Sequence, residues 1–540
     1  MAFIKAQKIQ KDSNGKIISG SAAIIDTIYG DFGTYHAKHS VREKLGKVLF
    51  LSDDKKSGIF LSPTRGLVSY DAKSDVFGEV SNNDSRIKDA GLFPETEIHT
   101  VFGDSYMLLS FLKNSGLMGV LRSVFLKDTD YERVLCHVLH GILKDGSRIG
   151  CDDFISKSFA SYVFKDIVLS TLHTDSPFFA LLGDDKNKIA FFKAFIAMMR
   201  KEEPDFGKGC YVDSTPLPND INDNPFNALC CHGVGSSEVM TRLALVLDGK
   251  SGLPVWYDII PGNILDLNEL KTVIEDVAST LGVEIDSFVL DAGYVSTELL
   301  QAIHIGSEKT FIGRMPNRKG YPYKTLYWEF KNEFSRGKYE FMRKKHSYFG
   351  KKKEVELFGV KEYAYVYIDR NDALSRYNTY MSENEEEYDQ FKDKDKDWYM
   401  VKYGYFILLS NIDTTPADLL SQYFCRTDIE GFFKTSKEYL KLLPLSKWTD
   451  LTVRGKILAD IIDTVALLFL QKKLANNTAS TTSIFGKTQS LMCFRNASGI
   501  VTVETPNKQV KEYYSLLGIN VPAHVKLLTF TKEVMQPEVV

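Results

Sequence analysis

The alternation of apolar and polar positions divides the N-terminal part of the chain into two kinds of segment. Residues 1–95 contain short alternating runs, such as KVLFLS and SGIFLS, separated by Gly, Ser and Asp. This period of two predicts a small β-rich region. Residues 96–205 instead carry apolar side chains at steps of three and four, which predicts helices. We therefore expect a β-rich segment followed by a helical one.

Residues 206–310 show the order strand, hairpin, helix, strand and helix. An apolar run at 210–212 predicts a short strand that ends at the prolines 216 and 218, and a glycine-containing turn at 248–252 joins two further strands. An amphipathic helix and the apolar run 288–290 follow. A right-handed crossover through that helix places the last strand parallel to the first and beside it. Asp213 and Asp291, which follow these two strands, are then neighbours.

A third acid, Glu430, lies in a segment with regular spacing of basic and aromatic residues. Tyr423, Arg426, Glu430 and Lys437 are separated by three, four and seven residues. At about 100° per residue they fall within roughly 60° of one another on one helix face. One carboxylate is thereby aligned with three groups that suit phosphate.

Two aspartates and a glutamate supply hard oxygen ligands of the kind that Mg²⁺ or Mn²⁺ prefers. A pair of such ions about 4 Å apart supports in-line phosphoryl displacement on a nucleic-acid backbone. For either aspartate alone, a turn residue or helix cap is the alternative interpretation. Clustered carboxylates repel one another unless a cation neutralises them, which favours the metal interpretation for the set.

These residues resemble the DDE transposases of bacterial and archaeal insertion sequences, in the branch with the signature Tyr-x2-Arg-x3-Glu-x6-Lys. The signature at 423–437 matches at every spacing. The resemblance spans roughly residues 206–475. Its other parts are Asp-Ser-Thr at 213–215, Gly-Leu-Pro at 252–254, Pro-Gly-Asn at 261–263 with Asp266, Asp-Ala-Gly-Tyr at 291–294, and YFILLSN from Tyr405.

The resemblance implies an α/β fold with a ribonuclease-H-like catalytic core, a mixed sheet with flanking helices interrupted by a β-rich insertion. It assigns Asp213, Asp291 and Glu430 as the catalytic, metal-binding triad for two Mg²⁺ or Mn²⁺ ions. Tyr423, Arg426 and Lys437 would contact DNA. The implied activity is cutting at the ends of an insertion sequence and joining the freed 3′-hydroxyl to target DNA, by a homodimer on double-stranded terminal repeats.

One departure concerns the segment after the first aspartate. Many relatives carry a Ser-Lys-Asp-x-Arg-like basic run there, whereas this chain has HGVGSSEVMTR, in which Arg242 and His232 are the basic residues. DNA contact from this loop is therefore not expected.

The resemblance divides the core into a first part at 206–310 and a second part at 405–475, separated by the insertion at 311–404. Residues 301–363 hold 15 Lys or Arg against 7 Asp or Glu, with aromatic residues between them. This mixture suits backbone neutralisation and base stacking, and Trp328 is the candidate for stacking. Most of the other aromatics are expected to form the insertion's own core. The acidic run and the KDKDKD that follow predict a solvated loop.

Composition leaves the terminal regions less defined. The N-terminal 1–95 is a candidate for DNA-end recognition, 96–205 for DNA binding or scaffolding, and 476–540 for dimer contacts. A net charge of −3 requires that DNA binding rely on local basic patches. Seven cysteines without Cys-x2-Cys spacing disfavour disulfides and zinc. The apolar runs are too short to span a membrane and no signal peptide is visible, so a cytoplasmic protein is expected.

Two other functions remain compatible with the sequence. One is a ribonuclease-H-like nuclease or junction resolvase, which shares the acids but lacks strand transfer. The insertion and the extra Tyr, Arg and Lys of the signature disfavour it. The other is a catalytically silent, transposase-derived DNA-binding protein, which the intact triad disfavours.

Overall fold

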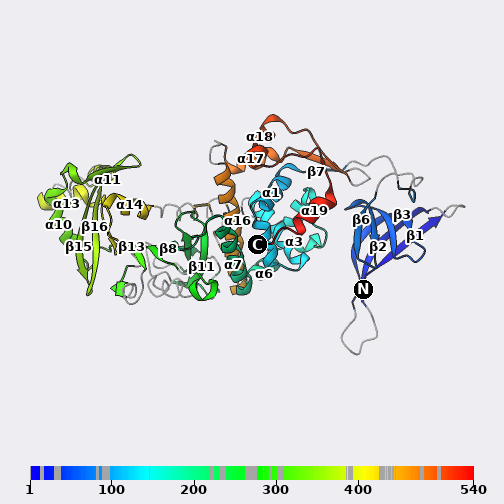
Figure 1. Cartoon of the computed structure of the whole chain (residues 1–540), viewed down its shortest axis with the longest axis horizontal. Coiled ribbons are helices and arrows are strands. Elements are labelled where there is room, and N and C mark those ends of the chain that lie inside the picture. Colours follow the sequence, from blue (N-terminus) through cyan, green and yellow to red (C-terminus); the bar gives the residue numbers. More distant parts are fainter. Residues whose placement is uncertain are drawn as a thin grey trace, which may run out of the picture. The chain divides into compact units, whose positions relative to one another are not determined.

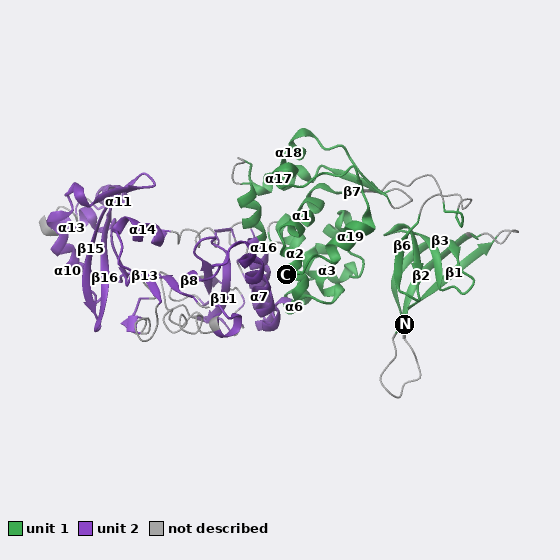
Figure 2. Cartoon of the chain, in the orientation of Figure 1, with its two compact units in different colours: residues 1–181, 466–540 green, residues 182–465 purple. Residues whose placement is uncertain are grey.

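The computed structural model divides into two compact units, residues 1–181 with 466–540 and residues 182–465 (Figures 1 and 2). Helices α6 (Ser176–Leu182) and α16 (Asp450–Lys473) contain the two unit boundaries. The structure describes residues 2–11, 17–28, 38–80, 84–87, 98–144, 146, 148–218, 221, 224, 226–229, 239–261, 277–283, 285–290, 295–297, 300–301, 309–384, 386, 393–424, 432, 434–435, 440, 443, 445–474, 479–495 and 500–539.

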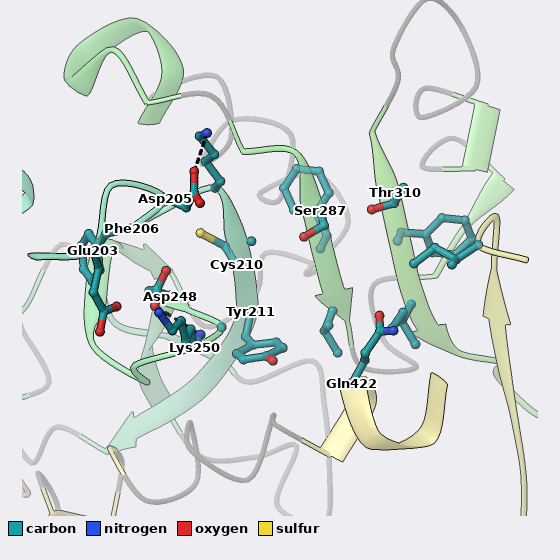
Figure 3. Close-up of a pocket in the computed structure, with 18 of the residues that line it drawn as sticks. Glu203, Asp205, Phe206, Cys210, Tyr211, Asp248, Lys250, Ser287, Thr310 and Gln422 are labelled. Carbon is teal, nitrogen blue, oxygen red and sulfur yellow. Dashed lines mark hydrogen bonds and ion pairs between the residues drawn. The ribbon is translucent and has the colours of Figure 1, made fainter. Parts of the chain in front are cut away.

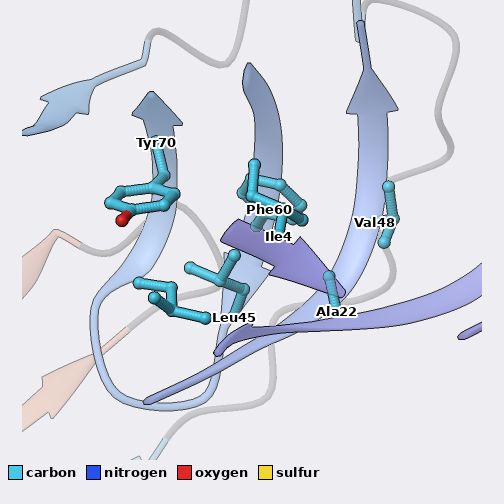
Figure 4. Close-up of a cluster of buried hydrophobic side chains, with 7 residues drawn as sticks. Ile4, Ala22, Leu45, Val48, Phe60 and Tyr70 are labelled. Atoms are coloured by element: carbon cyan, nitrogen blue, oxygen red, sulfur yellow. The ribbon is translucent and has the colours of Figure 1, made fainter. Parts of the chain in front are cut away.

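The first unit begins with a six-stranded antiparallel sheet in sequential order. Its strands are β1 (Ala2–Lys11), β2 (Ile17–Ile28), β3 (Lys38–Leu51), β4 (Ser57–Ser62), β5 (Gly66–Asp71) and β6 (Val76–Glu79). They lie within the segment that the alternating pattern predicts to be β-rich. One face buries Ile4, Leu45, Val48, Phe60 and Tyr70 in a common cluster (Figure 4). Burial of these side chains holds the meander together.

The rest of the first unit is helical and includes the C-terminal part of the chain. Its helices are α1 (Gly103–Asn114), α2 (Leu117–Val124), α3 (Asp128–Leu143), α4 (Cys151–Lys157), α5 (Ala160–Val163), the 3-10 turn η1 (Leu169–Leu172), α17 (Thr481–Thr488), α18 (Lys508–Leu516) and α19 (Leu527–Met535). A small sheet joins both ends in the order β20 (His524–Val525), β19 (Val501–Val503), β18 (Met492–Arg495) and β7 (Ile98–Val101). Tyr131 donates a hydrogen bond of 3.0 Å to the carbonyl of Val534. The segment assigned to dimer contacts thus forms part of this unit, and the dimer role itself stays a prediction.

A buried histidine makes the helical part of the first unit sensitive to acid. His137 on α3 is 0% exposed, stacks on Phe178 at 4.4 Å, and has no hydrogen-bond partner at either ring nitrogen. Burial, followed by the charge of Arg148, lowers the pKa of His137 to about 2. The unfolded chain takes up this proton below about pH 6.5, whereas the folded chain takes it up only near pH 2. Stability is therefore lost as the pH falls through this range.

We expect the free energy of unfolding to drop by about 2 kcal/mol between pH 7 and pH 5 from this group. His137→Phe should remove that part of the pH dependence, whereas His173→Phe, at a side chain that is 67% exposed, should leave it in place. Hydrogen exchange of the α3 amides at the two pH values measures the difference. Equal pH dependence in the wild type and His137→Phe would contradict the assignment.

The second unit is built on a ten-stranded mixed sheet. Its main path is β11 (Pro254–Pro261), β10 (Val239–Asp248), β8 (Gly209–Pro218), β12 (Ser287–Leu290), β13 (Thr310–Arg314), β17 (Tyr405–Ser410), β16 (Val360–Asp369), β15 (His346–Leu357) and β14 (Glu340–Arg343), with β9 (Ala228–Leu229) paired to β10. The pairs β8–β12 and β12–β13 are parallel, and the other pairs are antiparallel. The prediction of a mixed α/β protein is confirmed.

The described helices of this unit are α7 (Asp185–Glu202), the π-helical turn η2 (Val277–Leu281), α10 (Tyr323–Phe330), the 3-10 turns η3 (Lys331–Glu333) and η4 (Gly337–Tyr339), α11 (Arg370–Glu383), α13 (Asp393–Lys402) and α14 (Pro416–Phe424). The segment 311–404 thus contains helices as well as the strands β14 to β16, which continue the main sheet. α13 covers most of the KDKDKD run, so the prediction of a loop there is wrong. Among the described residues no helix is long and apolar enough to cross a membrane.

Candidate active site

β8, which contains Asp213, and β12, which precedes Asp291, are parallel neighbours, as the predicted crossover requires. Val212 of β8 pairs with Leu290 of β12 in a parallel register. Asp213 and Asp291 are the next residues along the chain, so the sequence places both acids directly after a paired position. The backbone of Asp213 lies opposite Leu245 of β10. The side chain of Asp213 and the whole of Asp291 lie outside the described residues.

β8 is longer than the sequence pattern predicts. It continues to Pro218, so Asp213 lies in the middle of the strand, and the prediction that it ends the strand is wrong. Residues up to Pro218 remain paired with β10, whereas the pairing with β12 ends at Val212. Pro216 and Pro218 are two residues apart, so their missing N–H groups point to the same side. On that side, among the described residues, β8 has no partner strand after β12 ends, so the prolines cost no hydrogen bond between strands.

A buried aspartate fixes the turn between β10 and β11. Asp248 is 3% exposed, and its carboxylate accepts hydrogen bonds from the backbone N–H of Gly207 at 2.9 Å and of Ser251 at 2.9 Å. Gly252 has a φ of 69°, a conformation that glycine adopts without strain. The turn that the sequence predicts at 248–252 is therefore present. Through Gly207 it also holds the chain that enters β8.

The helix that contains the first signature residue is positioned by two buried tyrosines of β16. Tyr365 donates a hydrogen bond of 2.7 Å to the carbonyl of Ile412, and Tyr367 donates one of 2.7 Å to the carbonyl of Pro416. These bonds hold the start of α14. Tyr423 lies near the end of this helix and is 6% exposed. The rest of the signature, Arg426, Glu430 and Lys437, lies outside the described residues.

A cavity of about 690 Å³ lies against β8, β12 and β13 (Figure 3). Its wall includes Tyr211, Val289 and Ile312 from the three strands, and Gln422 from α14. In Figure 3, Tyr211 and Gln422 lie toward the same end of the cavity, where β12 ends. Tyr211 is two residues before Asp213, and Gln422 is four residues before Arg426. The sequence did not indicate either wall residue, because neither carries a charge or a motif.

The turn between β14 and β15 carries a run of basic residues next to the end of α14. Lys344 and Lys345 form this turn with φ values of 46° and 68°, and both side chains are exposed. The guanidinium of Arg343 lies 4.6 Å from the centre of the Phe424 ring. The basic turn is therefore coupled to the residue that precedes Cys425 and Arg426 in the chain. The sequence shows the RKK run, but it does not show that Phe424 lies beside it.

The aromatics of the insertion divide as predicted between its core and its surface. Tyr327, Phe330 and Phe349 are at most 3% exposed and form a core. Trp328 on α10 is 47% exposed, and the ammonium of Lys331 lies 5.1 Å from the centre of its ring. About half of this side chain is thus exposed. Its role in stacking on a base stays a prediction.

One cluster of metal-type ligands is present among the described residues, and it does not include the predicted triad. Single ligand atoms of His346, Asp369 and Asp372 lie within 4.8 Å of one another. The carboxylate of Asp369 accepts the backbone N–H of Asp372 at 3.0 Å as the N-cap of α11, and it lies 2.9 Å from Nδ1 of His346. Helix capping accounts for this arrangement.

Comparison with known proteins bears on the segment that contains this site. Residues 205–459 match the family model described as the transposase DDE domain. This DDE-matched segment includes Asp213, Asp291 and Glu430, and it supports the predicted resemblance at the level of the domain. The branch of insertion-sequence transposases with the Tyr-Arg-Glu-Lys signature stays a prediction.

Two further comparisons used curated proteins and solved structures. A search of curated proteins finds no match. Among solved structures, the chain is similar to a piggyBac transposase in a synaptic complex with hairpin DNA, with 10% sequence identity and a TM-score of 0.35. The alignment covers 82% of this chain and 84% of that one.

Proposed function

We propose that this protein is a DNA transposase that cuts at the ends of an insertion sequence and joins the freed 3′-hydroxyl to target DNA. The observation that carries the proposal is the DDE-matched segment 205–459, which contains all three candidate acids. The parallel pairing of Val212 with Leu290 adds support, because the two aspartates follow these residues. The core would be ribonuclease-H-like, and the mixed sheet with its antiparallel hairpin and parallel pairs is compatible with that assignment.

Asp213, Asp291 and Glu430 would hold the metal in this proposal. Two aspartates and a glutamate form a donor set of hard oxygens that fits Mg²⁺ or Mn²⁺. When bound, such ions activate the attacking oxygen and stabilise the leaving oxygen of a phosphoryl displacement. The three acids would hold such ions beside the reacting phosphate, and Arg426 and Lys437 would neutralise the flanking DNA backbone. Two copies of the chain would act together on paired ends.

Removal of divalent metal provides the test of the proposed reaction. A labelled duplex that carries the element's terminal repeat should be cut at the repeat boundary in Mg²⁺ and left intact after EDTA treatment. Added Mn²⁺ should restore cutting, because it accepts the same oxygen ligands. A duplex with a scrambled repeat is the control. Binding of the repeat without cutting in metal would favour the silent DNA-binding protein, and equal cutting of both duplexes would favour a nuclease.

The basic turn at Lys344 and Lys345 is proposed to contact the DNA backbone. Its two lysines occupy left-handed backbone conformations, where Asn-Gly is the preferred pair. The double substitution Lys344→Asn with Lys345→Gly should stabilise the hairpin by about 1 kcal/mol. It should nevertheless weaken DNA binding. The plot of log K against the logarithm of the salt concentration should become less steep by about 2, because two phosphate contacts are lost.

Thermal unfolding and fluorescence anisotropy over a salt series measure the two effects. Lys361→Asn, at an exposed position of β16, is the matched control and should change neither. An unchanged salt dependence in the double variant would show that the turn does not touch DNA.

A further inference from the structure

A second cavity, of about 550 Å³, lies within the first unit and outside the DDE-matched segment. Its polar wall residues are Arg65, Glu79, Tyr162, Lys165, His524, Lys526 and Thr531. They include the guanidinium of Arg65, the amines of Lys165 and Lys526, and the carboxylate of Glu79. The proposed reaction uses none of them.

Lys165 is a basic residue of this wall without an ion-pair partner among the described residues. Its ammonium donates hydrogen bonds to the carbonyl oxygens of Thr64 at 2.9 Å and Ser161 at 2.6 Å. Burial lowers the pKa of Lys165 well below its usual range, and the charges of Arg65 and Arg495 lower it further. An ammonium has three donors, and these bonds use two of them. A negatively charged ligand would satisfy the third donor and offset the repulsion.

Arg495 adds a guanidinium that pairs with no carboxylate of the described residues. It is 4% exposed, its guanidinium donates to the carbonyls of Ser62 and Pro63, and its Nη1 has no hydrogen-bond partner. The guanidinium lies 4.9 Å from the centre of the Tyr162 ring, which is part of the cavity wall. A buried charge without a compensating partner is costly, and cations grouped in this way create a positive potential that attracts anions.

Two acids near this wall, Glu43 and Glu132, already have partners. Arg65 and Glu43 form an ion pair of 2.7 Å. The carboxylate of Glu132 accepts the backbone N–H groups of Lys165, Asp166 and Ile167 at 2.7 to 2.8 Å. Burial raises the pKa of Glu132 to about 7, so this group carries only part of its charge at neutral pH. Glu43 and Glu132 therefore do not balance the charge of Arg495, and Glu79 is the carboxylate of the cavity wall itself.

We propose that this cavity binds a phosphate group, with Lys165 and Lys526 as direct ligands and Arg495 as a supporting charge behind Tyr162. Ammonium groups form short, charge-assisted hydrogen bonds with phosphate oxygens. Two sources share this chemistry, a phosphate of the DNA backbone and a free phosphate ion. The DNA source rests on the proposed function, whereas the phosphate site itself does not.

Calorimetric titration of the full-length protein with inorganic phosphate, at constant ionic strength set with chloride, tests the site. Lys165→Gln and Lys526→Gln should each weaken binding by about tenfold, because each removes one charge-assisted contact. Because Lys526 is exposed, Lys526→Gln should fold, and it tests the site even if Lys165→Gln unfolds. Lys157→Gln, at a side chain that is 70% exposed on α4, is the matched control and should bind like the wild type. Absence of binding to the wild type, or equal binding by all variants, would overturn the proposal.

Anisotropy with a labelled DNA duplex then distinguishes the two sources. A weaker DNA affinity of Lys526→Gln than of Lys157→Gln identifies the backbone phosphate as the ligand. Equal DNA affinities, together with lost phosphate binding, identify the free ion. Neither measurement depends on DNA cutting, so failure of this site and failure of the proposed transposase reaction are observed separately.

Discussion

Glu430→Gln should abolish metal-dependent cutting of the terminal-repeat DNA, lowering its rate by about a thousandfold or more. The glutamine keeps the size of the side chain and removes the charge that would hold a divalent ion. Loss of metal-assisted stabilisation of the transition state by about 4 kcal/mol corresponds to this factor. DNA binding should persist, because the basic residues of the signature and of the β14–β15 turn remain. Gel-based cleavage and anisotropy, performed on the same samples, measure both quantities.

Two comparisons sharpen this result. Asp213→Asn and Asp291→Asn should have similar effects, and any pair of these substitutions should be no worse than one, because residues that act as a unit are not additive. Glu356→Gln, an equivalent change at an exposed position of β15 in the DDE-matched segment, should cut like the wild type. Wild-type rates in Glu430→Gln would remove this residue from the proposed triad.

Asp258→Ala should destabilise the second unit by about 3 kcal/mol, because it leaves a buried ammonium without its partner. The carboxylate of Asp258 on β11 lies 2.8 Å from the ammonium of Lys188 on α7, with side-chain exposures of 19% and 9%. It also accepts a hydrogen bond of 2.9 Å from Nε1 of Trp256. The ammonium of Lys188 lies 3.8 Å from the centre of the Trp256 ring. The substitution therefore removes the ion pair between α7 and β11 and the hydrogen-bond acceptor of Trp256.

Tryptophan fluorescence during urea unfolding measures this change in the second unit alone. All four tryptophans, at 256, 328, 398 and 448, belong to residues 182–465. Lys188→Met should cost less, since it removes the buried charge together with the pair. Asp205→Ala, which breaks an exposed pair with Lys208, should not shift the transition. A shift of equal size in Asp205→Ala and Asp258→Ala would contradict the assigned role of burial.

The parts of the fold that follow from local sequence could be predicted. The β10–β11 hairpin is such a part, because Asp248 and Gly252 determine its turn within a few residues. The parallel pairing of β8 with β12 followed from a general rule of chain crossing. Both features lie in the segment where the three candidate acids occur. The strand pairing on which the candidate site is built therefore follows from the sequence.

Other parts depend on contacts that local patterns do not contain. The prolines of β8 indicated a strand end, but they are tolerated because β12 ends first. The charged run before Trp398 indicated a loop. Most of this run instead forms the first half of α13, and the Trp398 ring of the same helix lies 4.7 Å from that of Tyr327. Thr100 and Cys493 pair across the small sheet although they are 393 residues apart. No periodicity along the chain carries that information.

Because β18 and α19 belong to the first unit, this unit can be completed only after the second unit has been synthesised. Residues 182–465 are synthesised before β18, which pairs with β7, and before α19, whose Val534 carbonyl accepts the hydrogen bond from Tyr131. The early half of the first unit must therefore remain incompletely packed until β18 and α19 have been synthesised. A premature stop codon after residue 465 would leave the DDE-matched segment intact and remove the structure on which α1 and α3 depend.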